Sequence, residues 1–459
     1  MMAESIDAGT RKKVLKVIFI SLLLDLVSFT FILPLFPALL RYYRDLEAPT
    51  NLDAYDNQST ILTHILHYLN AYKVSFARPI DSRYDIVLLG GALGSLFSFL
   101  QALSSPVIGL LSDRYGRRTA LLTSMCGNIL SVLLWLLATD FRTFLLSRIV
   151  GGLSEGNVQL AIAIGTDISD EKQRGSTMAL IGICFSISFT LGPALGAWLS
   201  TINYVQSNPF AMVAGFSLLL IVIETFYLYF YLPETLPSKI VSTELNSSTS
   251  PTSLSSNKAD TNKSNEKLDG IKKSASGTNS HFILNFTHLI FILFFSGMEF
   301  SLPFMTFDLF GYTSALNGRL LGYMGLVASI IQGRVTRRLP PLQTVRIGTV
   351  SCLVALLILS RINTVAGLYI ATTLLSITTA TVVTGLNSLS SFEASADERG
   401  AKLGLLRSWG QLGRALGPLL FTSIYWWAGR EFAYTVGSTG MLGVVMLAMF
   451  GLKETKRSS

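Results

Sequence analysis

The sequence has few charged residues and few cysteines for a chain of 459 residues. Only 14% of its residues are charged, against roughly 25% in ordinary soluble domains, and 50% are hydrophobic. This composition argues against a soluble globular protein. The cysteines Cys126, Cys184 and Cys352 all fall in apolar segments, without the spacing of a disulfide framework or of a metal site. We therefore expect the three cysteines to be packing residues, and we expect the protein to bind no metal and no cofactor.

The basic excess does not indicate a partner of opposite charge. The formal net charge of +8 comes from Lys and Arg gathered in short stretches between apolar runs. A nucleic-acid role would need a soluble basic face, which this pattern does not provide. Nor does any nucleophile–base pair or metal arrangement support an enzyme. We expect neither a nucleic-acid partner nor catalysis.

What the sequence has in abundance is apolar runs of about 20 residues, the length that crosses a bilayer as a helix. The expected fold is an all-α membrane protein with twelve transmembrane helices, of which the eighth and ninth are short. The segments are residues 17–39, 86–111, 120–138, 144–164, 177–199, 210–231, 283–307, 320–333, 345–359, 366–386, 403–425 and 434–451.

The placement of Lys and Arg orients these helices. Basic residues precede the first segment at 11–16, follow the last at 453–457, and fill every second short loop between them. By the positive-inside rule both termini are cytoplasmic. The first segment has no small-residue cleavage site and contains Asp25, so it is interpreted as a retained span and not as a signal peptide. The host membrane, plasma membrane or organelle, stays open.

Residues 236–281 interrupt the apolar pattern. This stretch is rich in Ser, Thr, Asn and Lys and has almost no aromatic residues, so it cannot bury enough surface to fold. We expect residues 1–235 and 282–459 to form two six-helix bundles joined by a disordered cytoplasmic linker. The second long loop, 41–84, is expected outside and carries the sequon Asn57-Gln58-Ser59, a usable glycosylation site.

Residues 109–118, GLLSDRYGRR, lie between two apolar runs. Glycine permits close helix approach and a tight turn, and arginine holds the turn at the cytoplasmic face. The pattern resembles the loop between helices 2 and 3 of the major facilitator superfamily of secondary transporters. The resemblance implies that Asp113 faces the start of the eleventh helix in one gating state only. The matching positions are Gly109, Asp113, Arg114, Gly116, Arg117 and Arg118.

Other motifs narrow the resemblance to the drug:proton antiporter branch. Asp25 followed by Pro34 and Pro37 is similar to the first helix of tetracycline/proton antiporters, and each proline removes a helical hydrogen bond. The pairs Gly192-Pro193 and Gly417-Pro418 stand 225 residues apart, as do Arg174-Gly175 and Arg399-Gly400. This displacement indicates parallel repeats, as the two halves of this superfamily have. The expected packing and hinge residues are Pro34, Pro37, Gly192, Pro193, Gly196, Pro303, Gly417 and Pro418.

Charged residues inside a span are costly and therefore suggest function. Asp25 and Glu155 are expected at similar depth, and Glu299 lies beside Pro303. Two carboxyls in a low-dielectric interior disfavour double ionisation, so one of the first two is expected to hold a proton near neutral pH. These three residues are the candidates for proton coupling. Glu224 is a further intramembrane charge, whose facing the sequence leaves open.

Arg414 lies near the midplane of the eleventh helix and needs an anion, a carbonyl or water. It either pairs with Glu299 or receives an anionic substrate, and the sequence does not decide between them. Arg407, four residues into the same helix, is expected to snorkel to the interface. Besides Arg414, the candidate substrate-binding residues are Trp409, Gln411 and Gln159.

The resemblance implies a transporter that works by alternating access. It is closest to the tetracycline-transporter-like animal members, which are thought to move organic anions. The expected partners are a small organic solute, protons and the lipid bilayer. The expected working unit is a monomer. The alternatives are a facilitative uniporter or symporter of a small metabolite, and a receptor-like protein that does not transport.

The orientation of the chain is directly testable. If the 41–84 loop is outside, enzymatic deglycosylation shifts the mobility of the wild type but not of Asn57→Gln. An epitope placed at residue 260 is then cleaved by protease only after the membrane is permeabilised. Cleavage of that epitope in intact cells would reverse the predicted topology.

Overall fold

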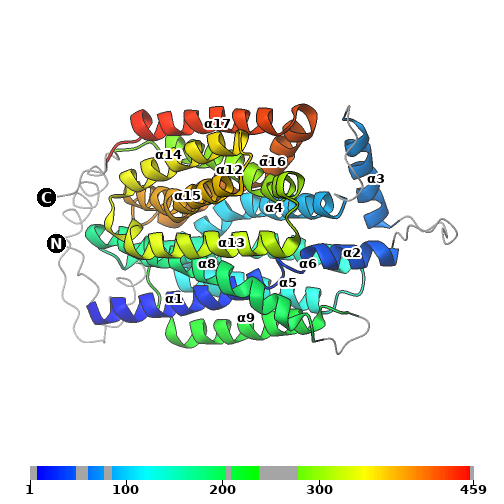
Figure 1. Ribbon diagram of the computed structural model, residues 1–459. Helices are drawn as coiled ribbons and strands as arrows, with labels where there is room; N and C mark the ends of the chain where they lie inside the picture. The colour runs from blue at the N-terminus through cyan, green and yellow to red at the C-terminus, as the bar shows by residue number, and fades with distance from the viewer. Residues whose placement is uncertain (1–7, 48–59, 77–84, 203–207, 237–277, 455–459) are drawn as a thin grey trace, which may run out of the picture.

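The computed structural model describes residues 8–47, 60–76, 85–202, 208–236 and 278–454. Within these ranges every regular element is a helix, which confirms the predicted all-helical class. Eight of the described helices are long and apolar enough to cross a membrane. Most helices lie side by side in one bundle, whereas α3 (Ile61–Val74) stands across one end of it (Figure 1).

The elements before the predicted linker are all α-helices. Besides α3 they are α1 (Ala8–Thr30), α2 (Phe36–Glu47), α4 (Asp85–Tyr115), α5 (Arg117–Leu136), α6 (Phe141–Ser154), α7 (Asn157–Asp167), α8 (Glu171–Leu199) and α9 (Ala211–Tyr231). The elements after it are α12 (His281–Phe310), α13 (Ser314–Arg334), η3 (Thr336–Arg338), α14 (Pro341–Ser360), α15 (Val365–Glu393), α16 (Arg399–Ala428), α17 (Arg430–Met446) and η4 (Leu447–Gly451).

The first predicted span, 17–39, is divided. Helix α1 begins nine residues earlier than expected and ends at Thr30, and α2 continues after a turn. In that turn the Leu33 N–H bonds the Thr30 carbonyl at 3.2 Å, and the Leu35 N–H bonds the Ile32 carbonyl at 3.0 Å. Pro34 and Pro37 lack the N–H groups that would continue the helix, so the break follows from the sequence.

The fourth predicted span, 144–164, is also divided, without any proline. Helix α6 ends at Ser154, Glu155 takes φ −69° and ψ 86°, and α7 begins at Asn157. Gly156 lies against Ile108 and Ser124, where a larger side chain would clash. Broken helix at membrane depth is tolerated only against protein or a cavity. The prediction of one continuous helix here was wrong.

The predicted 41–84 loop is partly helical. Helix α2 extends to Glu47, and α3 begins after Thr60, whose side chain accepts the Thr63 N–H at 3.2 Å. An ion pair of Lys73 with Asp85 connects the end of α3 to the start of α4. The sequon Asn57 and most of the predicted linker, 237–277, lie outside the described residues.

The predicted 109–118 loop is almost entirely helical. Helix α4 continues through Tyr115 and α5 begins at Arg117, so only Gly116 separates them. Gly116 has φ +105°, a conformation that side chains with a Cβ rarely adopt. Gly109 therefore lies within α4 and not in a turn. The end of the bundle that carries this glycine is called the Gly116 end below.

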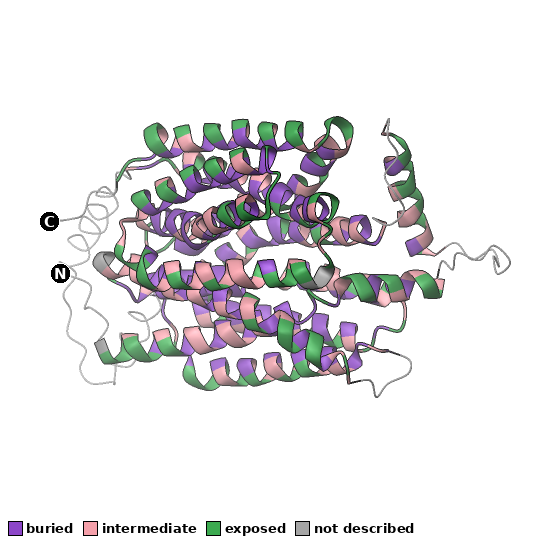
Figure 2. Cartoon of the chain, in the orientation of Figure 1, coloured by how far each residue is buried: buried purple, intermediate pink, exposed green. Residues whose placement is uncertain are grey.

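Buried apolar side chains form two separate clusters. One contains residues from 14 to 232 together with Leu403, and the other contains residues from 284 to 452. Burial follows the inward faces of the helices, and exposed residues follow the outward faces (Figure 2). Cys184 and Cys352 are buried, whereas Cys126 is exposed, so the expectation of packing was wrong for Cys126.

The internal repeat reappears as matched contacts. The Thr30 hydroxyl donates to the Ser188 carbonyl at 3.1 Å, and the Ser296 hydroxyl donates to the Gly413 carbonyl at 3.4 Å. The two acceptors are 225 residues apart, which is the displacement found in the sequence. Gly192 lies against Thr30 in the same way as Gly417 lies against Ser296. Helix α8 thus packs on α1 as α16 packs on α12.

In the next contact between these helix pairs, the glycine lies on α8 in the first half but on α12, the counterpart of α1, in the second half. Gly196 of α8 lies against the backbone of Phe31 at the end of α1, whereas Gly297 of α12 lies against the side chain of Phe421 in α16. In both halves a glycine allows the two helices to approach closely. Between the halves, α4 packs against α16 and α8 packs against α13.

Candidate functional site

Asp113 connects the two halves at the Gly116 end. Its Oδ1 accepts the Gly400 N–H at 2.9 Å and its Oδ2 accepts the Ala401 N–H at 2.7 Å. These N–H groups belong to the first turn of α16. The backbone N–H groups of a first helical turn have no carbonyl acceptor within their own helix. A carboxylate at a helix N-terminus also favours the positive end of the helix dipole. The structure thus places Asp113 where the family resemblance implies.

Arg117 extends this contact into a buried network. Its Nη1 donates to Asp113 at 2.6 Å and its Nε donates to Asp167 at 2.7 Å. Asp167 in turn accepts Nη1 of Arg399 at 2.6 Å. The side chains of Arg117 and Asp167 are fully buried. Two carboxylates and two guanidinium groups therefore alternate across the junction of α4, α5, α7 and α16.

The remaining basic residues of the motif lie outside that network. Arg114 is exposed over the Tyr115 ring, and Arg118 donates to the Tyr229 carbonyl at 2.6 Å. The start of α5 is held instead by Glu234, which accepts the Arg117 N–H at 2.8 Å. Sequence analysis did not predict Asp167 or Glu234, because each takes its role from a helix distant in sequence.

Close backbone approach supports the junction. Gly109 of α4 lies against the Gly400 carbonyl, and Gly404 of α16 lies against the Ser105 carbonyl. A Cβ at either glycine would collide with backbone that cannot move aside. The glycines therefore fix the distance at which Asp113 reaches the start of α16.

A group of carboxyls lies deep in the first half. Asp25 of α1 is 4% exposed and accepts Nδ2 of Asn157 at 3.0 Å. Glu224 of α9 is 1% exposed and accepts the Ser21 hydroxyl at 2.6 Å. Both lie within electrostatic reach of Glu155 at the break between α6 and α7. The sequence did not decide which way Glu224 faces, and the structure shows that its side chain faces the interior.

A cavity of about 40 Å³ adjoins this group. Asp25, Glu155 and Arg148 line it, together with polar side chains such as Asn128 and Ser131. Its volume is enough for about three water molecules at roughly 10–15 Å³ each. Arg148 stacks on the rings of Trp135 and Phe144, 5.9 and 5.4 Å from their centroids. No hydrogen bond or ion pair joins Arg148 to Asp25 among the described residues.

Arg407 of α16 faces this group from the second half. Ser105 of α4 contacts both Gln159, through a 3.0 Å hydrogen bond, and Gly404. Since Asp167 at the end of α7 meets Arg399 at the start of α16, the two helices run in opposite directions. Arg407, one turn beyond Gly404, therefore reaches the level of the α6–α7 break, within electrostatic range of Glu155 and Asp25.

This location corrects the prediction for Arg407. We expected it to snorkel to the interface, because it is only four residues into the predicted span 403–425. Helix α16 in fact begins at Arg399, and the α4–α16 contact buries its first turns between the halves. The polar atoms around Arg407 are incompletely paired. The buried atoms without a hydrogen-bond partner in the described chain include Nε of Arg407, Oε1 of Gln411, Oε1 of Gln159 and Oδ1 of Asn157. Oε2 of Glu224, in the group of carboxyls of the first half, is another.

Arg414 and Glu299 form a loose ion pair. Nη1 of Arg414 is 3.5 Å from Oε2 of Glu299, and the two side chains are 44% and 50% exposed. An exposed pair at this distance contributes little stability, of the order of 0–1 kcal/mol. The structure therefore brings the two residues together without enclosing them. Pro303 lies one turn beyond Glu299 in α12.

Two of the other predicted substrate residues, Trp409 and Gln159, do not converge on Arg414. Trp409 turns toward Phe282 near the start of α12, with ring centroids 5.7 Å apart. Gln159 is 3% exposed beneath α4. Sequence analysis missed His288, which is buried in α12, contacts the Leu406 carbonyl through Nδ1 at 2.9 Å, and lies within electrostatic reach of Arg414 and Arg407.

Comparison with known proteins identifies relatives over the whole chain. The profile "Major Facilitator Superfamily" matches residues 18–418. The chain is 33% identical to the mouse "Major facilitator superfamily domain-containing protein 10", over 98% of this chain and 95% of the mouse protein. It is 24% identical to the Escherichia coli "Tetracycline resistance protein, class B", over 80% of this chain and 89% of that protein.

Solved structures give the same result. The crystal structure of the human organic anion transporter MFSD10 (TETRAN) matches with a TM-score of 0.80 and 30% identity, over 95% of this chain and 99% of that chain. The proton:xylose symporter XylE matches with a TM-score of 0.69 over 97% of both chains. At 13% identity this second likeness shows the fold alone.

Asp113→Asn is expected to loosen the junction at the Gly116 end. The amide cannot accept both N–H groups of α16, and Arg117 loses an anionic partner. A hydrogen bond to a charged group is worth about 1.5–3 kcal/mol, so opening should become about tenfold more frequent or more. The measurement is the rate at which a maleimide labels Ser408→Cys, a position at the α4–α16 contact, with Cys126 replaced by Ser.

Arg114→Ala is the matched control, because Arg114 neighbours Asp113 but takes no part in the network. Its labelling rate should equal that of the background. Equal labelling in the Asp113 and Arg114 variants would show that the aspartate does not hold the junction closed.

Proposed function

Because the chain belongs to the major facilitator superfamily, we propose that it moves small organic anions across a membrane by alternating access, with proton coupling. Its relatives are transporters and not enzymes, and the chain is a multi-pass membrane transporter of small molecules. The human relative of 30% identity is described as an organic anion transporter, which supports the same substrate class here.

The proposed topology has twelve spans in two six-helix bundles, 1–235 and 282–459, joined by a cytoplasmic linker. Eight spans are the helices that meet the apolar criterion. The other four are α1 with α2, α6 with α7, α13, and α16. Helices α6 and α7, with 14 and 11 residues, are each too short to meet the criterion, and α1 and α16 carry charged residues within the span. The Gly116 end is then cytoplasmic, with both termini on that side.

The observation that carries the proposal is the position of Arg407 opposite Asp25 and Glu155. The cation belongs to one half and the carboxyls belong to the other. A rocking motion of the halves therefore changes the distance between opposite charges at the middle of the membrane. The incompletely paired atoms around them supply donors and acceptors for a polar solute.

The same arrangement suggests how a proton is coupled. An anion that binds Arg407 removes one of the two cations near Glu155, the other being Arg148. A buried carboxylate that loses part of its counter-charge takes up a proton more readily. Anion and proton then occupy the site together, and each favours the binding of the other. Coupled movement in the same direction is the outcome of this linkage.

Arg414 is the proposed outer contact for the anion. Its guanidinium is 44% exposed and is held only by the 3.5 Å contact with Glu299. A planar fork of donors suits carboxylate and sulfonate groups. Arg407 is a second cation in the same half, whereas the buried carboxyls lie in the other.

The proposal is tested by uptake into proteoliposomes. The panel contains labelled aromatic carboxylates and sulfonates, the corresponding neutral amides, and tetraethylammonium as a cation, each with and without a pH gradient. Anion uptake that increases when the outside is acidic supports the proposal. Indifference to pH from about 5 to 8 would favour a facilitative uniporter, and absence of uptake across the panel would favour a receptor-like role.

Asp25→Asn should separate coupling from translocation. The amide retains the contact with Asn157 but cannot carry a proton or a charge. Gradient-driven uptake is expected to decrease at least tenfold, while exchange of labelled for unlabelled anion persists. Asp45→Asn, at an exposed position on α2, is the control and should transport as the wild type does. Equal loss of exchange and gradient-driven uptake would place Asp25 in the structural core instead.

Arg414→Gln should weaken anion uptake without affecting folding. Loss of a charge-assisted hydrogen bond costs about 1.5–3 kcal/mol, or about 10–150-fold in affinity. Arg414→Lys keeps the charge but loses the fork, so it should restore only part of the uptake. Exposed Arg319→Gln on α13 is the matched control. Concentration-dependent uptake and the thermal midpoint are measured for each variant.

The double change Arg414→Gln with Glu299→Gln distinguishes the two roles of the pair. If Arg414 binds substrate, the double variant transports no better than Arg414→Gln alone. If the pair is structural, removing both partners costs less than stranding one, and transport returns. Recovery would assign Arg414 to the scaffold.

A further inference from the structure

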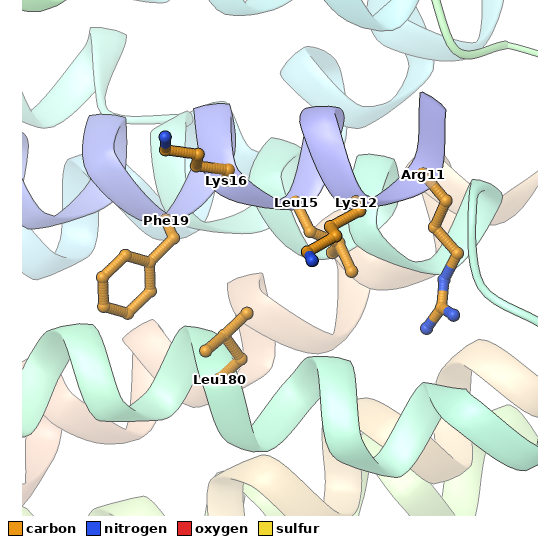
Figure 3. Close-up of a pocket in the computed structure, with 6 residues that line it drawn as sticks. All are labelled: Arg11, Lys12, Leu15, Lys16, Phe19 and Leu180. Carbon is orange, nitrogen blue, oxygen red and sulfur yellow. The ribbon is translucent and has the colours of Figure 1, made fainter. Parts of the chain in front are cut away.

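A cavity lies away from the polar centre, between α1 and α8. Its volume is about 440 Å³, and its lining residues are Arg11, Lys12, Leu15, Lys16, Phe19 and Leu180. Figure 3 shows Phe19 of α1 and Leu180 of α8 projecting into the gap between the two helices. The guanidinium of Arg11 extends beside them at the end of the gap (Figure 3).

The gap has a structural cause. Farther along the bundle the same helices touch, because Gly192 and Gly196 of α8 receive Thr30 and Phe31 of α1. Toward the Gly116 end, the Cys184 thiol contacts the Phe19 carbonyl at 3.6 Å. Beyond this contact lies the cavity, lined by residues 11–19 of α1 and by Leu180 of α8. The cavity is thus a cleft whose narrow end, at Phe19, is bounded by these contacts and whose wide end faces the Gly116 end.

The two ends of this cleft differ in chemistry. Arg11, Lys12 and Lys16 lie at its wide end, and none of them has an ion-pair partner in the part of the chain that the structure describes. Nε of Arg11 is buried without a hydrogen-bond partner. The narrow end is formed by the partly exposed apolar side chains of Phe19 and Leu180. Three cations thus stand one to two helical turns from an apolar wall.

We propose that this cleft binds one anionic phospholipid from the leaflet at the Gly116 end. The headgroup phosphate contacts Arg11, Lys12 and Lys16, and an acyl chain covers Leu15, Phe19 and Leu180. Basic side chains beside a spanning helix favour anionic lipid, because each contributes about fivefold to affinity near a charged surface. The long stems of these side chains also allow their charges to reach the headgroup level.

The apolar wall favours a lipid over a soluble anion. A free phosphate or a nucleotide would use the basic end alone and leave Phe19 and Leu180 uncovered. A phospholipid satisfies both ends at once, since its charged and apolar parts are joined at the depth where the chemistry of the cleft changes. The proposal does not depend on which solute the transporter carries.

The test is native mass spectrometry of the full-length protein in detergent, titrated with palmitoyl-oleoyl phosphatidylserine or with the phosphatidylcholine of the same chains. The first phosphatidylserine should bind at least tenfold more tightly than phosphatidylcholine. Replacing Arg11, Lys12 and Lys16 together by Ala should reduce phosphatidylserine affinity to the phosphatidylcholine level. Leu180→Trp, which fills the apolar end, should weaken both lipids at least threefold.

Lys13→Ala is the matched control, because Lys13 is adjacent in the same helix but does not line the cleft. It should bind phosphatidylserine within twofold of the wild type, whereas Lys12→Ala alone should bind about fivefold more weakly. The comparison of Lys12→Ala with Lys13→Ala tests the lipid site even if the triple variant fails to fold. Equal losses in Lys12→Ala and Lys13→Ala would show diffuse surface charge and overturn the proposal.

Two further outcomes would also overturn it. Equal affinity for the two lipids in the wild type would remove the role of the basic residues. Competition by glycerophosphoserine as strong as by the intact lipid would identify a soluble anion site in place of a lipid site.

Discussion

The contact between Asp113 and the start of α16 is the interaction on which the closed Gly116 end depends. It joins a helix end without internal acceptors to a buried network of Arg117, Asp167 and Arg399. A buried ion pair has a small net stability, although stranding one partner is costly. A network whose members alternate in sign therefore closes firmly when complete, yet separates at moderate cost once water reaches every member. Those are the properties required of a gate.

The polar centre follows the same principle across the two halves. The carboxyls Asp25, Glu155 and Glu224 belong to the first half, and Arg407 belongs to the second. Neither half contains enough opposite charge to compensate its own buried charges fully. The carboxyls and Arg407 therefore compensate one another best when the two halves are together. When the halves separate, a solute or a proton would have to take the place of the missing partner. The helix break at Glu155 contributes to this, because it exposes backbone to a polar cavity and allows α7 to meet α16.

Local features of this fold were predictable, whereas the meeting of distant residues was not. The interruption at Pro34 and Pro37, the position of Asp113 and the 225-residue repeat all follow from residue chemistry or spacing along the chain. The break at Glu155 was missed, because glycines alone do not determine where a helix ends. Arg407 was misplaced because the start of α16 was predicted four residues, about one turn, too late. Asp167 and His288 carry no local signal, since their roles arise only when α16 packs against them.

The repeat also explains how one architecture supports two different tasks. Thr30 and Ser296 make equivalent hydrogen bonds, and a glycine lies against a phenylalanine in both halves. These contacts fix the helix spacing and leave the neighbouring positions free to differ. Asp25 lies five residues before Thr30, whereas Phe291 stands five before Ser296. The backbone frame is therefore shared, whereas the buried group of carboxyls Asp25, Glu155 and Glu224 lies in the first half only.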